Sequence, residues 1–97
     1  MELLERVAAE TGDLERVTSG SSVEWRRGPR AFAVAGPDHA EFRLDAAVAR
    51  AAIRTPDTDP SPRGPGWILF RPSALDGHAV DRAEAWFASA WRFAERP

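Results

Sequence analysis

The 97-residue chain contains no cysteine. Without thiols it has no disulfide framework, no thiolate ligands for zinc or iron–sulfur clusters, and no thiol nucleophile. It also lacks a long apolar run, because stretches such as 67–70 are far shorter than the ~20 residues that cross a membrane. Acidic residues interrupt the first six positions, where a signal peptide needs an apolar segment. We therefore expect a cytoplasmic protein.

The chain also contains no lysine, asparagine, glutamine or tyrosine, so all 13 of its basic residues are arginine. GC-rich bacterial coding explains this bias, since arginine and alanine use GC-rich codons. Acidic residues number 15, and the formal net charge is −2. A dedicated nucleic-acid-binding domain is usually basic, so any contact with nucleic acid must come from a local patch.

The residues that are present have the balance of an ordinary globular protein, with 43% hydrophobic and 29% charged. The length predicts a single domain over 1–97. A domain of this size has a thin margin of stability, which pairing with a copy of itself would increase.

The first half of the chain predicts one helix and an antiparallel meander. Apolar residues recur at helical spacing over 1–11. Serine and glycine dominate 13–20, where only Leu14 and Val17 are expected to pack. Alternating apolar residues then predict three strands, at 22–25, 31–35 and 40–44. Glycine and proline place turns at 26–30 and 36–39 between them.

The second half predicts two helices and one strand. Asp45 is a good N-cap for a helix over 46–54, whose Val48, Ala51 and Ala52 we expect to face the sheet. Four prolines make 55–66 irregular. We expect 67–70 to be a fully covered strand, 72–78 a loop and 79–95 a helix with an apolar arc of roughly 160°. An arc this wide indicates a helix in a cleft or a contact with another chain.

These elements define the predicted fold class. The order α-β-β-β-α-β-α is typical of an α+β two-layer sandwich, with a small antiparallel sheet that carries its helices on one face.

Side chains that could carry out catalysis are scattered along the sequence. His39 and His78 both fall in predicted turns or loops, and Ser19, Ser21 and Ser22 have no neighbouring base. The pair Asp57 and Asp59 lacks the other ligands of a calcium loop. Gly64-Pro65-Gly66 precedes a strand and not the helix that a phosphate loop needs. We therefore expect no catalytic residues, no metal site and no cofactor.

One turn concentrates positive charge. Arg26, Arg27 and Arg30 lie around the first predicted turn and could hold phosphates, with help from Arg63 or Arg43. A solvated turn that protects the hairpin from aggregation is the alternative.

The chain is also rich in tryptophan, with four residues. Packing in the core is one interpretation. The other is that Trp25 or Trp86, with Phe93, lies exposed and forms a partner interface.

Four local patterns resemble the MmcQ/YjbR-like family of small bacterial proteins. They are the strand–turn–strand segment 23–34, the step Glu41-Phe42-Arg43-Leu44-Asp45, the start Gly66-Trp67-Ile68 and the closing Ala90-Trp91-Arg92-Phe93-Ala94. The resemblance covers about residues 20–97. It implies a compact α+β fold that is often compared with a double-wing DNA-binding shape, with no established enzymatic activity.

Two functions follow as expectations. The first is a non-enzymatic binding module that contacts a protein or a small molecule and can self-associate through its last helix. The alternative is a weak nucleic-acid-binding protein that uses the arginine-rich turn.

Overall fold

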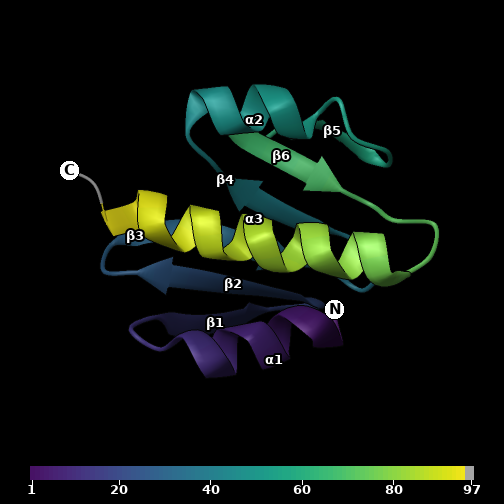
Figure 1. Cartoon of the computed structure of the whole chain (residues 1–97). Helices are drawn as coiled ribbons and strands as arrows, with labels where there is room; N and C mark the ends of the chain where they lie inside the picture. Colours follow the sequence, from purple (N-terminus) through teal and green to yellow (C-terminus); the bar gives the residue numbers. More distant parts are fainter. Residues whose placement is uncertain (96–97) are drawn as a thin grey trace.

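The structure is a computed structural model that describes residues 1–95. Three helices and six strands follow one another along the chain (Figure 1). Their bounds are α1 (Glu2–Thr11), β1 (Glu15–Ser19), β2 (Ser22–Arg27), β3 (Arg30–Ala35), β4 (Ala40–Arg43), α2 (Ala46–Ala52), β5 (Thr58–Pro60), β6 (Trp67–Phe70) and α3 (Gly77–Glu95). Among the described residues, no helix is long and apolar enough to cross a membrane.

The six strands form one antiparallel sheet in the order β1-β2-β3-β4-β6-β5. A single cluster of buried residues joins this sheet to α1, α2 and α3, and Figure 1 shows α3 crossing the middle strands. The predicted α+β class, with an antiparallel sheet and helices, is confirmed.

The two faces of the sheet differ in composition. Alternate residues such as Trp25, Phe42 and Phe70 point into the core below the helices. The residues between them form a row across all six strands on the opposite face. This row, defined by successive cross-strand partners, is Val17, Glu24, Val34, Glu41, Leu69 and Asp59. Apolar and acidic residues alternate along it, so like charges are never direct neighbours.

Helix α3 provides the centre of the core. Phe87 is fully buried and meets Trp25 and Phe32 edge-on, at ring-centroid distances of 5.6 and 5.3 Å. Trp86 packs edge-on against Phe70, 5.2 Å away. Such pairs contribute about 0.5–1.5 kcal/mol each beyond the burial of their area. The wide apolar arc of α3 is explained by a cleft, because α1 packs beside it over the sheet.

Two strands lie in segments where we predicted no strand. β1 falls within 13–20. All five of its residues are exposed, so its sequence has no alternation of apolar and polar residues that would indicate a strand. β5 falls within 55–66, where Pro60 is tolerated because an edge strand does not need every N–H group. Both strands are at the edges of the sheet, where no buried face imposes an alternating pattern.

Several predicted boundaries also need correction. Arg26 and Arg27 belong to β2 and Arg30 to β3, so the turn is only Gly28-Pro29. The second helix ends at Ala52, since Thr55 bonds the carbonyl of that residue. The last helix starts at Gly77, where the Asp76 carboxylate accepts the Ala79 N–H. Strand β6 is not fully covered, because Trp67 and Leu69 are only half-buried.

Candidate functional site

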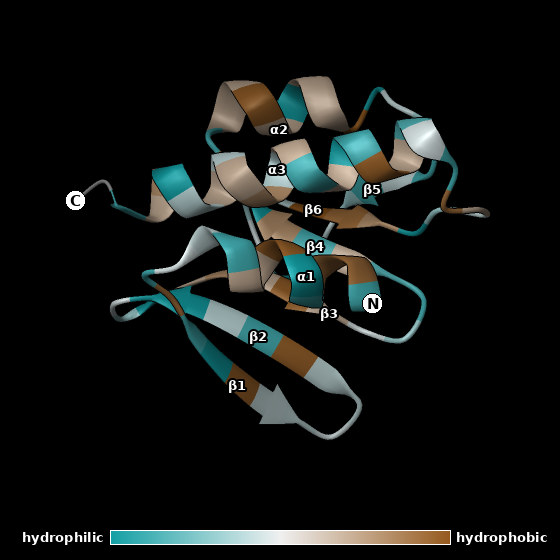
Figure 2. Ribbon diagram, turned by 60° about the horizontal axis from the view of Figure 1, so that its bottom comes forward, coloured by the Kyte–Doolittle hydropathy of each residue, from teal (hydrophilic) through white to brown (hydrophobic). Residues whose placement is uncertain are grey.

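Helix α2 is the least covered apolar element. Six of its seven residues are alanine or valine, and Arg50 is its only charge. Figure 2 shows it in the colours of apolar residues apart from one teal band. A helix that is apolar on all sides is normally buried, yet only Ala52 is buried here. We define the α2 surface as the exposed residues Ala46, Ala47, Val48, Ala51 and Ile53.

This exposure corrects our prediction for the second helix. Val48 and Ala51 were expected to face the sheet together with Ala52, but both are exposed. Ala52 joins the core and the half-buried Ala49 packs against it, so the helix touches the protein along that narrow line.

A hollow lies on each side of α2. One, of about 240 Å³, separates the helix from the end of the sheet and includes Ala49, Ile53, Pro65 and Trp67 in its lining. The other, of about 270 Å³, lies between α2 and α3 and is lined by five residues, Asp45, Val48, Ser89, Arg92 and Phe93. The α2 surface is therefore a ridge between two hollows.

Arginines surround this apolar ridge. Arg50 lines the first hollow and Arg92 the second. Arg54 follows the last turn, where its N–H donates to the Ala51 carbonyl. All three are exposed, and Asp45 at the N-terminal end is the acid beside them. The ridge thus has an apolar centre and a mostly basic rim.

The predicted nucleic-acid-binding arginines have different surroundings. Arg26 pairs with Glu24, and Arg63 pairs with Glu41 at 3.1 Å. Arg27 pairs with Asp13 and Glu95, and its guanidinium lies 3.6 Å from the centre of the Trp91 ring. Arg30 is half-buried in β3. Three of the four are therefore matched with carboxylates, which lowers their gain from binding phosphates. Arg43, named beside them, lies against the ring of Phe93.

The predicted aromatic interface is wrong for two of its three residues. Trp25 is fully buried and Trp86 is 8% exposed, because both pack around α3 in the core. Phe93 is half-buried and lines the hollow beside α2. It is the one residue of the three that reaches a candidate surface.

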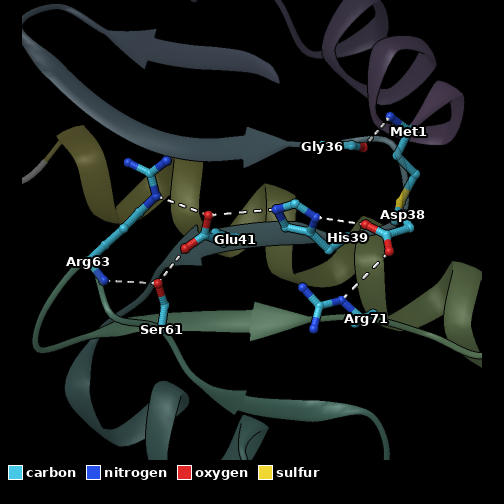
Figure 3. A network of polar contacts seen from close by, with 8 residues as sticks. All are labelled: Met1, Gly36, Asp38, His39, Glu41, Ser61, Arg63 and Arg71. Carbon is cyan, nitrogen blue, oxygen red and sulfur yellow. Dashed lines mark hydrogen bonds and ion pairs between the residues drawn. The ribbon is translucent and has the colours of Figure 1, made fainter. Parts of the chain in front are cut away.

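A polar cluster lies on the sheet face away from the helices (Figure 3). The buried Glu41 carboxylate accepts a hydrogen bond from the Ser61 hydroxyl and pairs with Arg63. Its other neighbour is His39, whose Nε2 is 4.0 Å away. The Ser61 oxygen in turn accepts the backbone N–H of Arg63 at 3.1 Å. These contacts fix the loop after β5 against β4.

The cluster continues through the histidine to a second carboxylate. His39 Nδ1 lies 3.0 Å from Asp38, and Arg71 lies 3.8 Å beyond it. The hydrogen bond with His39 holds the pKa of Asp38 below its ordinary value. A nucleophilic serine is activated by a neighbouring general base, most often an imidazole, but Ser61 donates to a carboxylate that is itself paired with Arg63. The geometry is that of a structural tie.

The other sequence candidates occupy structural positions. Ser19 and Ser22 flank the β1–β2 turn. Asp57 accepts the Ser73 N–H, with Asp59 in the neighbouring β5. Within residues 1–95, no group of three or more histidine and acidic side chains could hold a metal ion. The 64–66 segment directs the chain into β6, where the Gly66 carbonyl accepts the Leu44 N–H.

A further hollow of about 420 Å³ surrounds His78 at the start of α3. The main polar side chains that line this hollow already form hydrogen bonds within the protein. Arg82 donates to the Pro56 carbonyl at 2.8 Å, and Asp76 caps α3. His78 is exposed beside them.

Sequence reasoning missed the α2 surface and the Glu41–Ser61 contact. The first had a signal in the sequence. A short helix with one charge and no polar side needs an apolar contact on every side, so any side that the fold leaves uncovered becomes an exposed apolar surface. The second had none, since 20 positions separate the two residues and Ser61 lies in a proline-rich segment.

No family model, curated protein or solved structure matches the chain. The MmcQ/YjbR-like resemblance therefore stays a prediction.

Proposed function

We propose that this protein is a non-enzymatic binding module that holds a partner protein on the α2 surface. The observation that carries the proposal is the exposure of α2, an apolar helix of which only Ala52 is buried. An exposed apolar patch with a polar rim is typical of protein-binding sites. Small side chains such as Ala47 and Ala51 also let a partner backbone approach closely.

The rim defines the chemistry of the partner. Arg50, Arg54 and Arg92 bring three positive charges to the ridge, with one acid, Asp45. Guanidinium groups form paired hydrogen bonds with carboxylates. The partner segment should therefore present apolar side chains to α2 and aspartate or glutamate to its rim.

The non-enzymatic part of the proposal has separate support. Ser61 is bound to Glu41, and His39 faces Asp38 on its other nitrogen. No nucleophile with an imidazole base follows from these contacts. We retain the cytoplasm as the proposed location, where a protein without cysteine needs no oxidising environment.

Selection from a random-peptide phage library tests this proposal without a known partner. We expect the enriched peptides to combine apolar residues with aspartate or glutamate. Val48→Asp should weaken their binding at least about tenfold, or ~1.4 kcal/mol, because it places a carboxylate in the apolar centre. Leu75→Asp is the matched control, since Leu75 is 50% exposed and lies in the loop before α3.

Three results would contradict the proposal. One is a library that yields no enriched sequence. Another is binding that Val48→Asp leaves unchanged. The third is a labelled single-stranded oligonucleotide that binds at low salt and is released steeply as salt rises, which would favour the nucleic-acid alternative.

A further inference from the structure

The outer edge of β1 is an unpaired strand edge. β1 is the first strand in the sheet order, and all five of its residues are exposed. Figure 2 shows β1 at the rim of the sheet, with the helices on one face of the sheet. An exposed edge carries unpaired N–H and C=O groups that can pair with another strand.

The turn between β1 and β2 determines which amides point outward. Ser19 pairs with Ser22 across a two-residue turn, and Gly20 supplies the positive φ of 59° that such a turn requires. The residues that flank this turn exchange hydrogen bonds, and the pattern alternates along the strand. Ser19, Val17 and Glu15 therefore bond to β2, and the backbone groups of Arg16 and Thr18 point away from the sheet.

The opposite edge of the sheet is much less suited to pairing. β5 has only three residues, and one of them is Pro60, which has no N–H group. β1 has five residues and no proline. The difference selects β1 as the edge that can accept a strand.

We propose that β1 pairs antiparallel with β1 of a second copy of this chain, about a two-fold axis at Val17. In this register Arg16 of each copy faces the other copy's Thr18, and the outward amides of both residues form four backbone hydrogen bonds. Glu15 faces the other copy's Ser19, so no like charges oppose each other. A two-fold axis at Arg16 would place the two copies of Arg16 opposite each other. An axis at Arg16 or at Thr18 would also pair only one of the two outward-facing residues of β1 with an outward-facing residue of the other β1.

The side chains support this register. Val17 is 38% exposed and belongs to the row on the face without helices. The two valines meet in a pair without hydrogen bonds, where side chains approach most closely. Arg16 is already neutralised by Glu5, whose carboxylate is 2.6 Å away. This dimer is independent of the α2 surface and would join two sheets into one continuous sheet.

Cross-linking tests the register. The chain has no cysteine, so Val17→Cys introduces one thiol per copy. Its Cα atoms should lie about 4.5 Å apart, within the range of about 4.4–6.8 Å that a disulfide spans. Oxidised glutathione should convert Val17→Cys into a covalent dimer at least tenfold faster than Leu75→Cys, with release of two reduced glutathiones per bond. Equal rates for the two variants would overturn the proposal.

Sedimentation equilibrium tests the dimer without a cross-link. The unmodified chain should gain mass as its concentration rises from ~10 µM to ~1 mM, as for a small, weak interface. Val17→Lys should remain a monomer, because it opposes two ammonium groups. Val48→Lys is the matched control, since Val48 is 36% exposed on α2, and it should dimerise normally. The proposal would be overturned if the unmodified chain is a monomer at every concentration. It would also be overturned if Val48→Lys dissociates the dimer as Val17→Lys does.

Discussion

Helices α2 and α3 use apolar residues in opposite ways. α3 buries Ala79, Ala83, Trp86, Phe87, Ala90 and Ala94 and exposes charged residues on its other side. α2 has almost no polar side, yet it buries only Ala52. Figure 2 shows this contrast as mixed bands on α3 and nearly uniform apolar colour on α2. The difference separates a helix that stabilises the fold from one whose apolar surface is left for other contacts.

Phe87→Ala should have the largest effect on stability, because it empties the centre of the α3 core. We expect a loss of about 3–5 kcal/mol in the free energy of unfolding, as for other buried aromatic residues. Urea denaturation measures it. Leu75→Ala, at a side chain that is 50% exposed, should change stability by less than ~0.5 kcal/mol. A loss below 1 kcal/mol for Phe87→Ala would contradict the central role of α3.

Arg27→Ala should have the next largest effect, because Arg27 fixes the C-terminal end of α3. Its guanidinium stacks on Trp91 and donates to the Trp91 carbonyl at 3.1 Å. We expect a loss of about 1–3 kcal/mol, which thermal and urea unfolding both measure. Arg27→Lys should recover only part of it, since an ammonium cannot reproduce the planar stacking. Full recovery with lysine would show that charge alone matters.

Asp45→Ala should loosen α2 more than the rest of the molecule. The Asp45 carboxylate accepts the Ala47 N–H at 3.0 Å, and the helix has little buried surface to compensate for its loss. The cap should be worth about 1 kcal/mol. Hydrogen exchange should therefore become about fivefold faster for the α2 amides, with little change in α3. Asp45→Ser should preserve the protection, because serine is also a good N-cap.

The ion pair of Glu5 with Arg16 should have the smallest effect and shows what an exposed contact contributes. The hydrogen bond from Arg16 lowers the pKa of Glu5. Its contribution is therefore present above the ordinary glutamate pKa of about 4.3 and is lost as pH falls through the lower pKa of the folded state.

This contribution is small, because both side chains are well exposed to solvent. The difference in urea midpoint between the unmodified chain and Glu5→Gln should be present at pH 7 and should shrink as the pH is lowered through the acid range. Glu10→Gln, at the 4.0 Å pair with Arg6, is the control. A difference that grows in acid would reverse the assigned sign.

The elements with one buried side could be predicted from the sequence. α1, α3 and the central strands alternate or repeat their apolar residues, because the core covers one side of each. Asp45 was also correctly predicted as a cap, since capping depends on local chemistry. β1 and β5 were missed because edge strands are specified by their partner and not by a buried face.

The candidate site was less predictable. Val48 and Ala51 have the apolar character of core residues, and only the position of α2 at the margin of the sheet leaves them exposed. The surroundings of the predicted arginine patch could not be predicted for a related reason. Arg27 has partners at Asp13 and Glu95, which lie far from it in the sequence. Local composition shows which charges exist, but their neutralisation depends on the tertiary fold.

The indole N–H of Trp91 donates to the carbonyl of Asp13 across 78 positions of the chain. During synthesis, the segment that precedes the first hairpin must therefore wait for the chain as far as Trp91 to leave the ribosome before it acquires this partner. Contacts that span so much sequence slow folding, because a large loop must close first. A nascent chain stalled before Trp91 should consequently remain open to proteases at the Gly12–Asp13 corner.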